Sequence, residues 1–353
     1  MIGFDLLELT DTQQMIVEST RAVVPGDGSL DRVRGLRFAA PGFDRAMMAV
    51  VAENGWPLLR VAESDGGLGL GVTEWCTLMR VLGAALVPEP VLSTVLAGAL
   101  LGAALPDSVL AGETVLVTAW QDRDNGLDWT GGACAEGLTG AKRHVPGVAG
   151  ADLFAVVTGQ GLAVVPRDAG GLTIAQAETL DGGASGTLSF DATPAAFLPL
   201  PDVPALLDEA TLAQSAYLLG ISERALQITL DYLKVREQFG RPIGSFQALQ
   251  HRATEMTVQL DLLRAAIFAT ARRIDAGASA LQRMRDVSRC KRRAADLALH
   301  VAGEAVQMHG AMGITDEADI GLFVRKAMVE ANILGSARVH RARFVSLLEE
   351  AAA

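Results

Sequence analysis

Cysteine and histidine are scarce in this sequence, and their scarcity excludes several kinds of site. The three cysteines, Cys76, Cys134 and Cys290, lie far apart among 353 residues, and no CxxC pair or Cys/His cluster has zinc-ligand spacing. Disulfide frameworks and structural metal sites depend on such clusters, so the sequence predicts neither. Lone cysteines are typical of a reduced cytoplasm, where each is usually a small buried apolar residue.

Basic residues are also fewer than acidic residues. Lysine and arginine total 30 against 41 acidic residues, which gives a formal net charge of -11. A nucleic-acid-binding protein normally carries the opposite bias in order to neutralise phosphates. The first eight residues, Met-Ile-Gly-Phe-Asp-Leu-Leu-Glu, lack the basic region that precedes the apolar core of a secretory signal. We therefore expect a cytoplasmic protein that does not bind nucleic acid.

No hydrophobic run reaches the length of a membrane span. The most apolar run, Val91 to Leu105, is shorter than the roughly 20 residues that a spanning helix needs. Pro88, Pro90 and Pro106 bracket it. Hydrophobic residues nevertheless make up 50% of the chain, which is enough for a large core. The run, rich in Ala and Gly, is therefore predicted to form a tightly packed core helix.

Composition and the spacing of apolar residues divide the chain into three zones. Residues 1–112 show helical spacing of apolar residues, with Thr10 as a candidate N-cap and a Gly-rich break from Glu63 to Gly71. Residues 113–202 contain short β-branched runs separated by Gly, Asp and Pro, as in Leu153 to Thr158. We expect a helical domain followed by a small antiparallel β domain.

Residues 203–353 return to the helical pattern in long stretches. Helices are predicted over residues 205–235, 245–276 and 279–309, with a shorter helical tail over 317–350. Several stretches are apolar on more than one stripe, and one antiparallel bundle cannot cover every such face. The fold class is therefore α+β and mainly α, and the bundle predicts a dimer or a tetramer.

The first candidate site is the segment Arg236-Glu-Gln-Phe-Gly-Arg-Pro-Ile-Gly-Ser-Phe-Gln247. It places a guanidinium, aromatic rings and an amide around a corner between two helices. Arg236 has the planar donors that suit a phosphate, and Phe239 has a ring that can stack on a base. An ordinary inter-helix turn, with an arginine answering the helix dipole, would have the same local sequence.

The second candidate site is Gln307-Met-His-Gly-Ala-Met-Gly-Ile-Thr315, which follows the third long helix. Gly310 lets backbone approach a ligand closely, and Gln307 offers both a donor and an acceptor. A glycine C-cap followed by a loop is the alternative interpretation, and His309 has no Asp or Ser partner at a readable spacing.

Together the two segments resemble the C-terminal domain of the acyl-CoA dehydrogenase family. The patterns R-x-x-F-G-x-x-I-x-x-F-Q-x-x-x-H and Q-x-x-G-x-x-G-x-T-x-E are both present, in the family's order and within an α–β–α chain. The resemblance implies FAD as cofactor, an acyl-CoA substrate and an electron-transfer flavoprotein or similar acceptor. It assigns the FAD contacts, across a subunit interface, to Arg236, Phe239, Phe246, Gln247, Gln307, His309 and Gly310.

The β domain departs from the family's pattern. The family's Thr-Glu-Pro and Gly-Ser-Asp elements are missing from Val117 to Asp124. The flavin-covering Trp and Thr of a later element are replaced within Thr139-Gly-Ala-Lys-Arg-His-Val-Pro146. The flavin pocket of this domain is therefore expected to be degraded or rebuilt.

The catalytic base departs from the pattern as well. Removing the α-proton of an acyl-CoA needs a carboxylate with a raised pKa. The family's usual position for it, just before a glycine, aligns with Leu334 here, and the position on the first long helix aligns with Ala210. Glu209 is one residue away, which rotates it by roughly 100° around the helix. A solvated acidic first turn is the alternative interpretation of Asp208 and Glu209.

Three functions remain open on this basis. The leading hypothesis is a partner-type subunit of a heteromeric, FAD-dependent acyl-CoA dehydrogenase, which completes the FAD site while another subunit supplies the glutamate. The second hypothesis is a self-sufficient homo-oligomeric dehydrogenase that uses Glu209 as its base. The third is a structural partner that binds neither FAD nor CoA.

Overall fold

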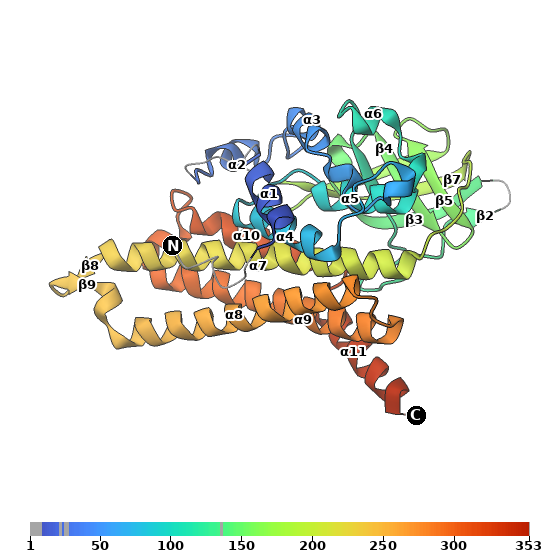
Figure 1. The fold of residues 1–353 in the computed structure, drawn as a ribbon. Helices are drawn as coiled ribbons and strands as arrows, with labels where there is room; N and C mark the ends of the chain where they lie inside the picture. Colours follow the sequence, from blue (N-terminus) through green and yellow to red (C-terminus); the bar gives the residue numbers. More distant parts are fainter. Residues whose placement is uncertain (1–8, 21–22, 25–27, 135–136, 353) are drawn as a thin grey trace.

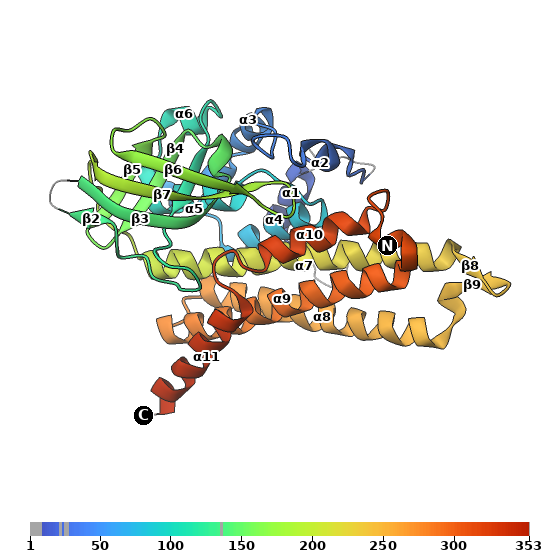
Figure 2. The same cartoon turned by 180° about the vertical axis from the view of Figure 1, so that it is seen from behind.

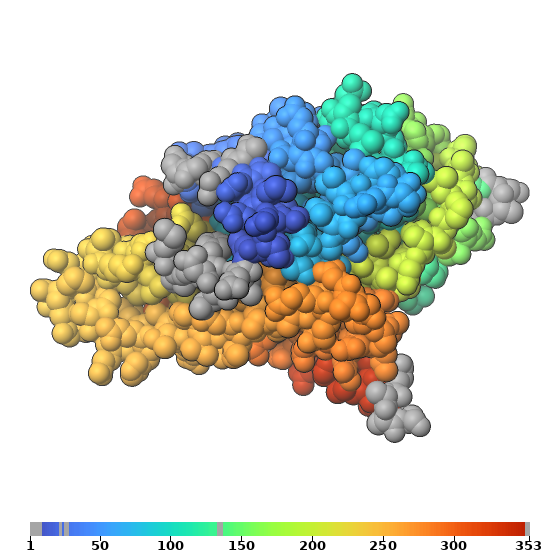
Figure 3. Space-filling view, in the orientation of Figure 1, coloured from blue at the N-terminus to red at the C-terminus, as the bar shows by residue number. Residues whose placement is uncertain are grey.

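The computed structural model describes residues 9–20, 23–24, 28–134 and 137–352. It confirms the predicted fold class, with helices, a small β region and a bundle of long helices following one another along the chain (Figure 1). The helical and β regions of the first two hundred residues lie together along one side of the bundle (Figures 1 and 3). No helix of the described chain is long and apolar enough to cross a membrane.

The N-terminal region consists of short helices around a few buried ones. Its elements are α1 (Asp11–Ser19), α2 (Asp31–Leu36), α3 (Ala46–Glu53), η3 (Trp56–Leu58), η4 (Glu63–Asp65), α4 (Val72–Ala84), α5 (Val91–Leu101), η5 (Gly102–Ala104) and α6 (Asp107–Leu110). Thr10 caps α1 as predicted, because its hydroxyl accepts from Gln13 N at 3.2 Å. The apolar run also forms its predicted core helix, α5, which is almost entirely buried.

The β region contains two sheets. One has the order β1 (Leu116–Ala119), β4 (Leu153–Thr158), β5 (Gly161–Pro166). The other has the order β2 (Ala133–Cys134), β3 (Gly137–Pro146), β7 (Ala184–Thr193), β6 (Leu172–Glu178), with η6 (Val148–Gly150) between β3 and β4. The predicted antiparallel pairing holds except between β1 and β4, which run parallel because a long excursion through β2 and β3 separates them.

The C-terminal region is a bundle of three long helices with two shorter ones. It comprises α7 (Val203–Val235), β8 (Glu237–Gln238), β9 (Arg241–Pro242), η7 (Ile243–Ser245), α8 (Gln247–Asp275), α9 (Ala280–His309), η8 (Gly310–Ile314), α10 (Ile320–Glu330) and α11 (Ala337–Ala352). The long helices lie side by side. The β8–β9 hairpin projects from one end of the bundle and α11 from the other (Figures 1 and 2).

Two glycines bring the N-terminal region and the bundle into close contact. A Cβ on Gly83 of α4 would lie 2.1 Å from Tyr217 O, and one on Gly220 of α7 would lie 2.0 Å from Arg80 O. Real Cβ atoms do not approach backbone oxygen so closely, so α4 and α7 can cross at this distance only with glycine on both sides.

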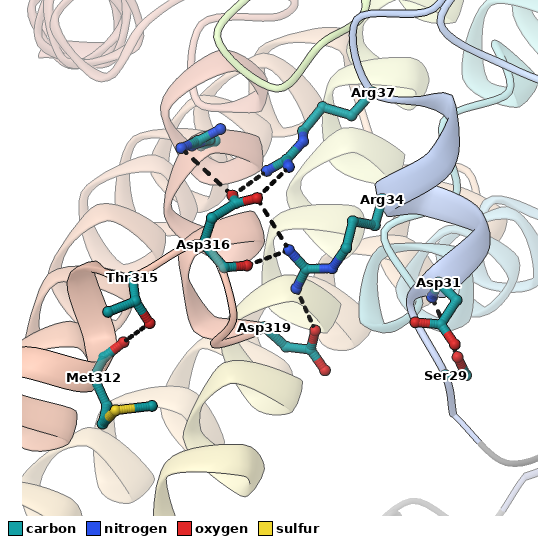
Figure 4. Close-up of polar contacts among 9 residues, drawn as sticks. Ser29, Asp31, Arg34, Arg37, Met312, Thr315, Asp316 and Asp319 are labelled. Atoms are coloured by element: carbon teal, nitrogen blue, oxygen red, sulfur yellow. Dashed lines mark hydrogen bonds and ion pairs between the residues drawn. The ribbon is translucent and has the colours of Figure 1, made fainter.

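A second contact between the N-terminal region and the C-terminal region is ionic. Arg37, just after α2, forks onto Asp316 with two bonds of 2.7 Å, and Arg34 donates to Asp319 at 2.8 Å and to the Asp316 carbonyl (Figure 4). The paired Arg37 holds the pKa of the Asp316 carboxyl below its usual range. These pairs fasten α2 to the segment that follows η8.

Candidate functional site

The first motif forms an exposed corner at the hairpin end of the bundle. Arg236 ends α7, where its N–H donates to Tyr232 O at 2.9 Å, and its side chain is exposed. Phe239 and Gly240 join β8 to β9 with φ of 54° and 76°, as a two-residue hairpin with positive φ at both central positions requires. Positive φ is costly for an aromatic residue, yet the Phe239 side chain is 91% exposed. An aromatic ring held out at this cost is typical of a contact with another molecule.

Two further motif residues lie at the same corner. The Phe246 ring meets the Phe239 ring edge-on at 6.1 Å between centroids, and the Arg241 guanidinium lies 4.2 Å above the Phe246 centroid. Gln247 begins α8 and is exposed. The structure therefore gathers the predicted contacts of the first motif on one exposed, aromatic and cationic corner.

The second motif lies at the same end of the bundle. The His309 ring stacks on Tyr232 of α7 at 4.4 Å between centroids, and the Tyr232 hydroxyl donates to His309 O at 3.3 Å. The His309 ring is therefore buried, with Nδ1 2.7 Å from Ala305 O. Gln307 and Gly310 remain exposed, and Gly310 has a φ of 62°. The stack holds the two motifs together, while Gln307 and Gly310 face outward.

The family's usual base position is apolar and buried. Leu334 is only 5% exposed and adopts a φ of 58°, and Gly335 follows with a φ of 97°. The imidazole of His340 lies with Nε2 2.7 Å from Leu334 O. Burial lowers the pKa of His340 to about 3, so the ring is neutral and its Nε2–H donates to that carbonyl. The turn is held firmly, but it offers no proton acceptor.

The acidic residues near the helix base position are not a solvated first turn, so that interpretation is wrong. Both carboxylates lie in the second turn of α7 and are buried. Asp208 accepts from Arg343 at 2.6 Å and from Arg283 at 3.2 Å. Glu209 Oε2 accepts from Arg60 Nε and from the guanidinium's terminal nitrogen at 3.1 and 2.7 Å. The sequence did not reveal these partners, because Arg60, Arg283 and Arg343 lie far away along the chain.

Burial and ion pairing act on Glu209 in opposite directions. Burial raises the pKa of the Glu209 carboxyl, and Arg60 opposes the rise without cancelling it. Arg60 also donates to Leu70 O in the Gly-rich turn. The Arg60–Glu209 pair therefore links that turn to α7.

A further buried cluster was not predicted. Lys326 of α10 pairs with Asp181, in the loop between β6 and β7, at 2.9 Å and with Glu330 at 3.0 Å. Gln214 of α7 donates to the Glu330 carboxylate at 2.7 Å. Burial opposes ionisation of Asp181, but Lys326 and two hydrogen bonds outweigh it and hold the pKa of Asp181 below its usual value.

The β-domain elements that depart from the family's pattern expose polar atoms. His144, in the flavin-covering element, has a φ of 53°, is exposed and lies 2.8 Å from Asp124 Oδ1. Pro146 ends the same strand, and the neighbouring Lys142 is buried against Asp122. Within the part of the chain that the structure describes, no group of His, Cys, Asp and Glu could hold a metal ion.

The family model for the acyl-CoA dehydrogenase C-terminal domain matches residues 203–346. Acyl-CoA dehydrogenase IpdE2 of Mycolicibacterium smegmatis is 30% identical over 339 residues, which cover 94% of this chain and 96% of that protein. The chain belongs to the acyl-CoA dehydrogenase family. The match extends well beyond the bundle, so the resemblance seen in the two motifs holds for the whole chain.

Two solved structures have the same fold as this chain and are each 27% identical to it. One is a variant of the Tcur3481–Tcur3483 steroid acyl-CoA dehydrogenase, with a TM-score of 0.86, 27% identity and coverage of 96% of this chain and 98% of that one. The other is the ChsE4–ChsE5 complex of Mycobacterium tuberculosis, with a TM-score of 0.85, 27% identity and coverage of 97% and 98%.

The residues present fit one half of FAD better than the other. The hairpin corner presents exposed Arg236, Phe239 and Gln247, which are suited to phosphate and base. The β domain instead presents an exposed histidine paired with Asp124 where the family covers the flavin ring with tryptophan. The exposed groups at the hairpin corner are thus of a kind that suits the nucleotide end of the cofactor, and His144 stands in place of the family's tryptophan cover for the flavin end.

Proposed function

We propose that this chain is the partner-type subunit of a heteromeric, FAD-dependent acyl-CoA dehydrogenase that acts on bulky acyl-CoAs such as steroid side-chain thioesters. The observation that carries the proposal is Leu334, a buried apolar side chain where the family usually places its base. A second subunit then supplies the glutamate and the substrate cleft. Both solved relatives above bear the names of two chains, and one is described as a steroid enzyme, which supports this choice.

In the proposed assembly FAD, when bound, supplies the hydride acceptor for α,β-dehydrogenation. The role of this chain is to hold the nucleotide end of the cofactor with Arg236, Phe239, Phe246, Gln247, Gln307 and Gly310. Arg236 neutralises phosphate charge, and the Phe239 ring covers an aromatic face. His309 acts indirectly, since its stack on Tyr232 fixes the second motif beside the first. An electron-transfer flavoprotein or similar acceptor would be the further partner of the assembled enzyme.

The proposal is tested by producing the chain alone and together with a glutamate-bearing acyl-CoA dehydrogenase chain from the same genome. We expect a stable complex with bound flavin and acyl-CoA-dependent turnover, and neither flavin nor turnover in this chain alone. A stable complex without flavin would instead favour a structural partner that binds neither FAD nor CoA. A flavin-bearing, active homo-oligomer would contradict the partner-subunit role.

A self-sufficient enzyme based on Glu209 is the second candidate, and one observation favours it. Burial raises the pKa of Glu209, as a general base of this chemistry requires. Against it, both hydrogen bonds from Arg60 fall on one carboxylate oxygen and stabilise the ionised form. Substitution of Glu209 in the assembled enzyme separates the two candidates.

A further inference from the structure

A cavity of about 460 Å³ lies where the N-terminal region meets the bundle. It is bounded by α4, α7 and α8, which pack against one another, and by the chain just before α2 (Figure 1). We call it the α4 cavity, and its described lining comes from residues 24, 28–30, 80–85, 223–231 and 257–264. A cavity of this volume holds a small organic molecule and not only a few waters.

Much of the wall of the α4 cavity is apolar. Val81 lines it from α4, Leu226 from α7 and Leu260 from α8, and Leu30 adds a fourth apolar side chain. Leu30, Leu226 and Leu260 are buried, so they form the inside of a cavity and not an exposed patch. A ligand with an apolar body would leave water on entering, which favours its binding.

The charged groups of the cavity are paired with one exception. The lining includes three arginines and three carboxylates, Arg80, Arg224, Arg264, Glu223, Asp231 and Asp261. The buried Arg80 and Arg264 donate to different oxygens of Glu223, at 2.7 and 2.8 Å. Arg264 also pairs with Asp261 at 2.6 Å. Asp231 pairs at 3.0 Å with a lysine one turn further along α7. The three carboxylates are therefore already neutralised.

Arg224 is the exception. It is half-buried in the lining, and none of the carboxylates that the structure describes pairs with it. Gly28 lies against its guanidinium: a Cβ on Gly28 would lie 3.0 Å from Nη2, and Gly28 has a φ of 72°. A side chain at that position would be strained and would crowd the guanidinium. The arginine therefore offers donors at the cavity that have already lost part of their water.

We propose that the α4 cavity binds a small organic acid, whose carboxylate pairs with Arg224 and whose apolar body lies between Val81 and Leu226. A guanidinium matches a carboxylate through two parallel hydrogen bonds. A neutral ligand would leave Arg224 unpaired, and a cation would find every described carboxylate of the lining engaged. A phosphate monoester carries nearly two negative charges at neutral pH, of which one arginine balances only one. The charge of the cavity therefore selects a monoanion.

This site is separate from the proposed cofactor contacts. No residue of its described lining belongs to either sequence motif or to the turn at Leu334. The inference does not depend on the partner-subunit role, because every group that it uses belongs to this chain. A ligand in the α4 cavity would touch three helices at once, so its binding should also raise the melting temperature of the chain.

The test is calorimetric titration of the full chain with octanoate, and with 1-octanol and octyl phosphate as analogues that change only the head group. We expect octanoate to bind about tenfold or more tightly than either analogue, because only its head group is balanced by Arg224. Arg224→Gln should weaken octanoate binding about tenfold or more and leave 1-octanol binding unchanged. Val81→Trp, which fills the cavity, should abolish the binding of all three.

Controls separate the site from folding and from total charge. Arg272→Gln removes one exposed arginine of α8 outside the cavity and should leave octanoate binding unchanged. Unchanged 1-octanol binding by Arg224→Gln shows that the cavity of this variant is intact, and thermal melting checks that each variant folds. Equal octanoate affinity of the wild type and Arg224→Gln would overturn the proposal. Failure of the wild-type chain to bind millimolar octanoate, or tighter binding of octyl phosphate, would overturn it as well.

Discussion

Arg60 and Glu209 form a buried ion pair between the Gly-rich turn and the first long helix of the bundle, with both guanidinium bonds on the same carboxylate oxygen. The pair indicates the role of Glu209, the acidic residue next to Ala210 at the helix base position. Because Arg60 also donates to Leu70 O, Glu209 takes part in the contact between the Gly-rich turn and α7. We interpret the carboxylate as structural.

Removing one member of this pair should lower the free energy of unfolding more than removing both members. Arg60→Met leaves a buried carboxylate without its partner and should destabilise the chain by about 3–5 kcal/mol. Arg60→Met/Glu209→Leu removes both charges and should recover most of that loss, because apolar replacements of a buried pair are often neutral or stabilising. Urea unfolding of the single and double variants measures the difference. A double variant as unstable as Arg60→Met would show that the unpaired carboxylate is not the cause of the loss.

The crossing of α4 and α7 should tolerate no added methyl group. Gly220→Ala would place its Cβ 2.0 Å from Arg80 O, so the helices must move apart and stability should fall by about 2 kcal/mol or more. Gly303→Ala is the matched control, since Gly303 is an exposed glycine of α9 with no atom within 4 Å of the added Cβ. That variant should gain about 0.4–1 kcal/mol. Thermal melting distinguishes the two, and a neutral Gly220→Ala would contradict the close crossing.

The bundle was more predictable than the residues around the base position, and the reason is physical. Helices over 203–235, 247–275 and 280–309 follow from local periodicity and from glycines at their ends, and their predicted ends agree within two residues. A corner between two helices was predicted at Arg236 to Gln247, and the structure forms it as the β8–β9 hairpin with Phe239 and Gly240 at its tip. Such features depend on neighbours along the chain.

The partners of Asp208, Glu209 and Lys326 depend on residues that lie far away in the sequence. Acidic residues near a helix start are usually solvated, and nothing near Glu209 indicates that Arg60 lies beside it. The parallel β1–β4 pair was missed for the same reason, because strand direction is set by a connection of more than thirty residues. Local pattern predicts elements, and long-range packing decides which charges are buried.

His340 should give the chain a characteristic acid sensitivity. The folded-state pKa is lowered to about 3 from an ordinary 6.5, so the unfolded chain binds the proton more readily between these values. Stability from this group is present above pH 6.5 and is lost as the pH falls, with a slope of up to about 1.4 kcal/mol per pH unit. His340→Gln should reduce the slope of unfolding free energy between pH 6.5 and 5 by about one proton.

Arg236 should hold cofactor and not merely end a helix. In the assembled enzyme Arg236→Ala should weaken FAD binding about tenfold or more, because a charge-assisted contact of about 1.5–3 kcal/mol is lost. Lys234→Ala removes a charge of the same sign from an exposed position on the same helix and should have little effect. Equilibrium dialysis of FAD against both variants provides the measurement. Equal retention in the two variants would make Arg236 a helix cap.

The most direct measurement is the turnover per bound flavin of the assembled two-chain enzyme carrying Glu209→Gln. Counting flavin removes any effect of the lost Arg60 pair on folding or assembly. If another subunit supplies the base, the rate per flavin should stay within about twofold of wild type. Loss of a working general base costs on the order of 10²–10⁴ in rate. A fall of that size, with flavin still bound, would make this chain the catalyst and contradict the account.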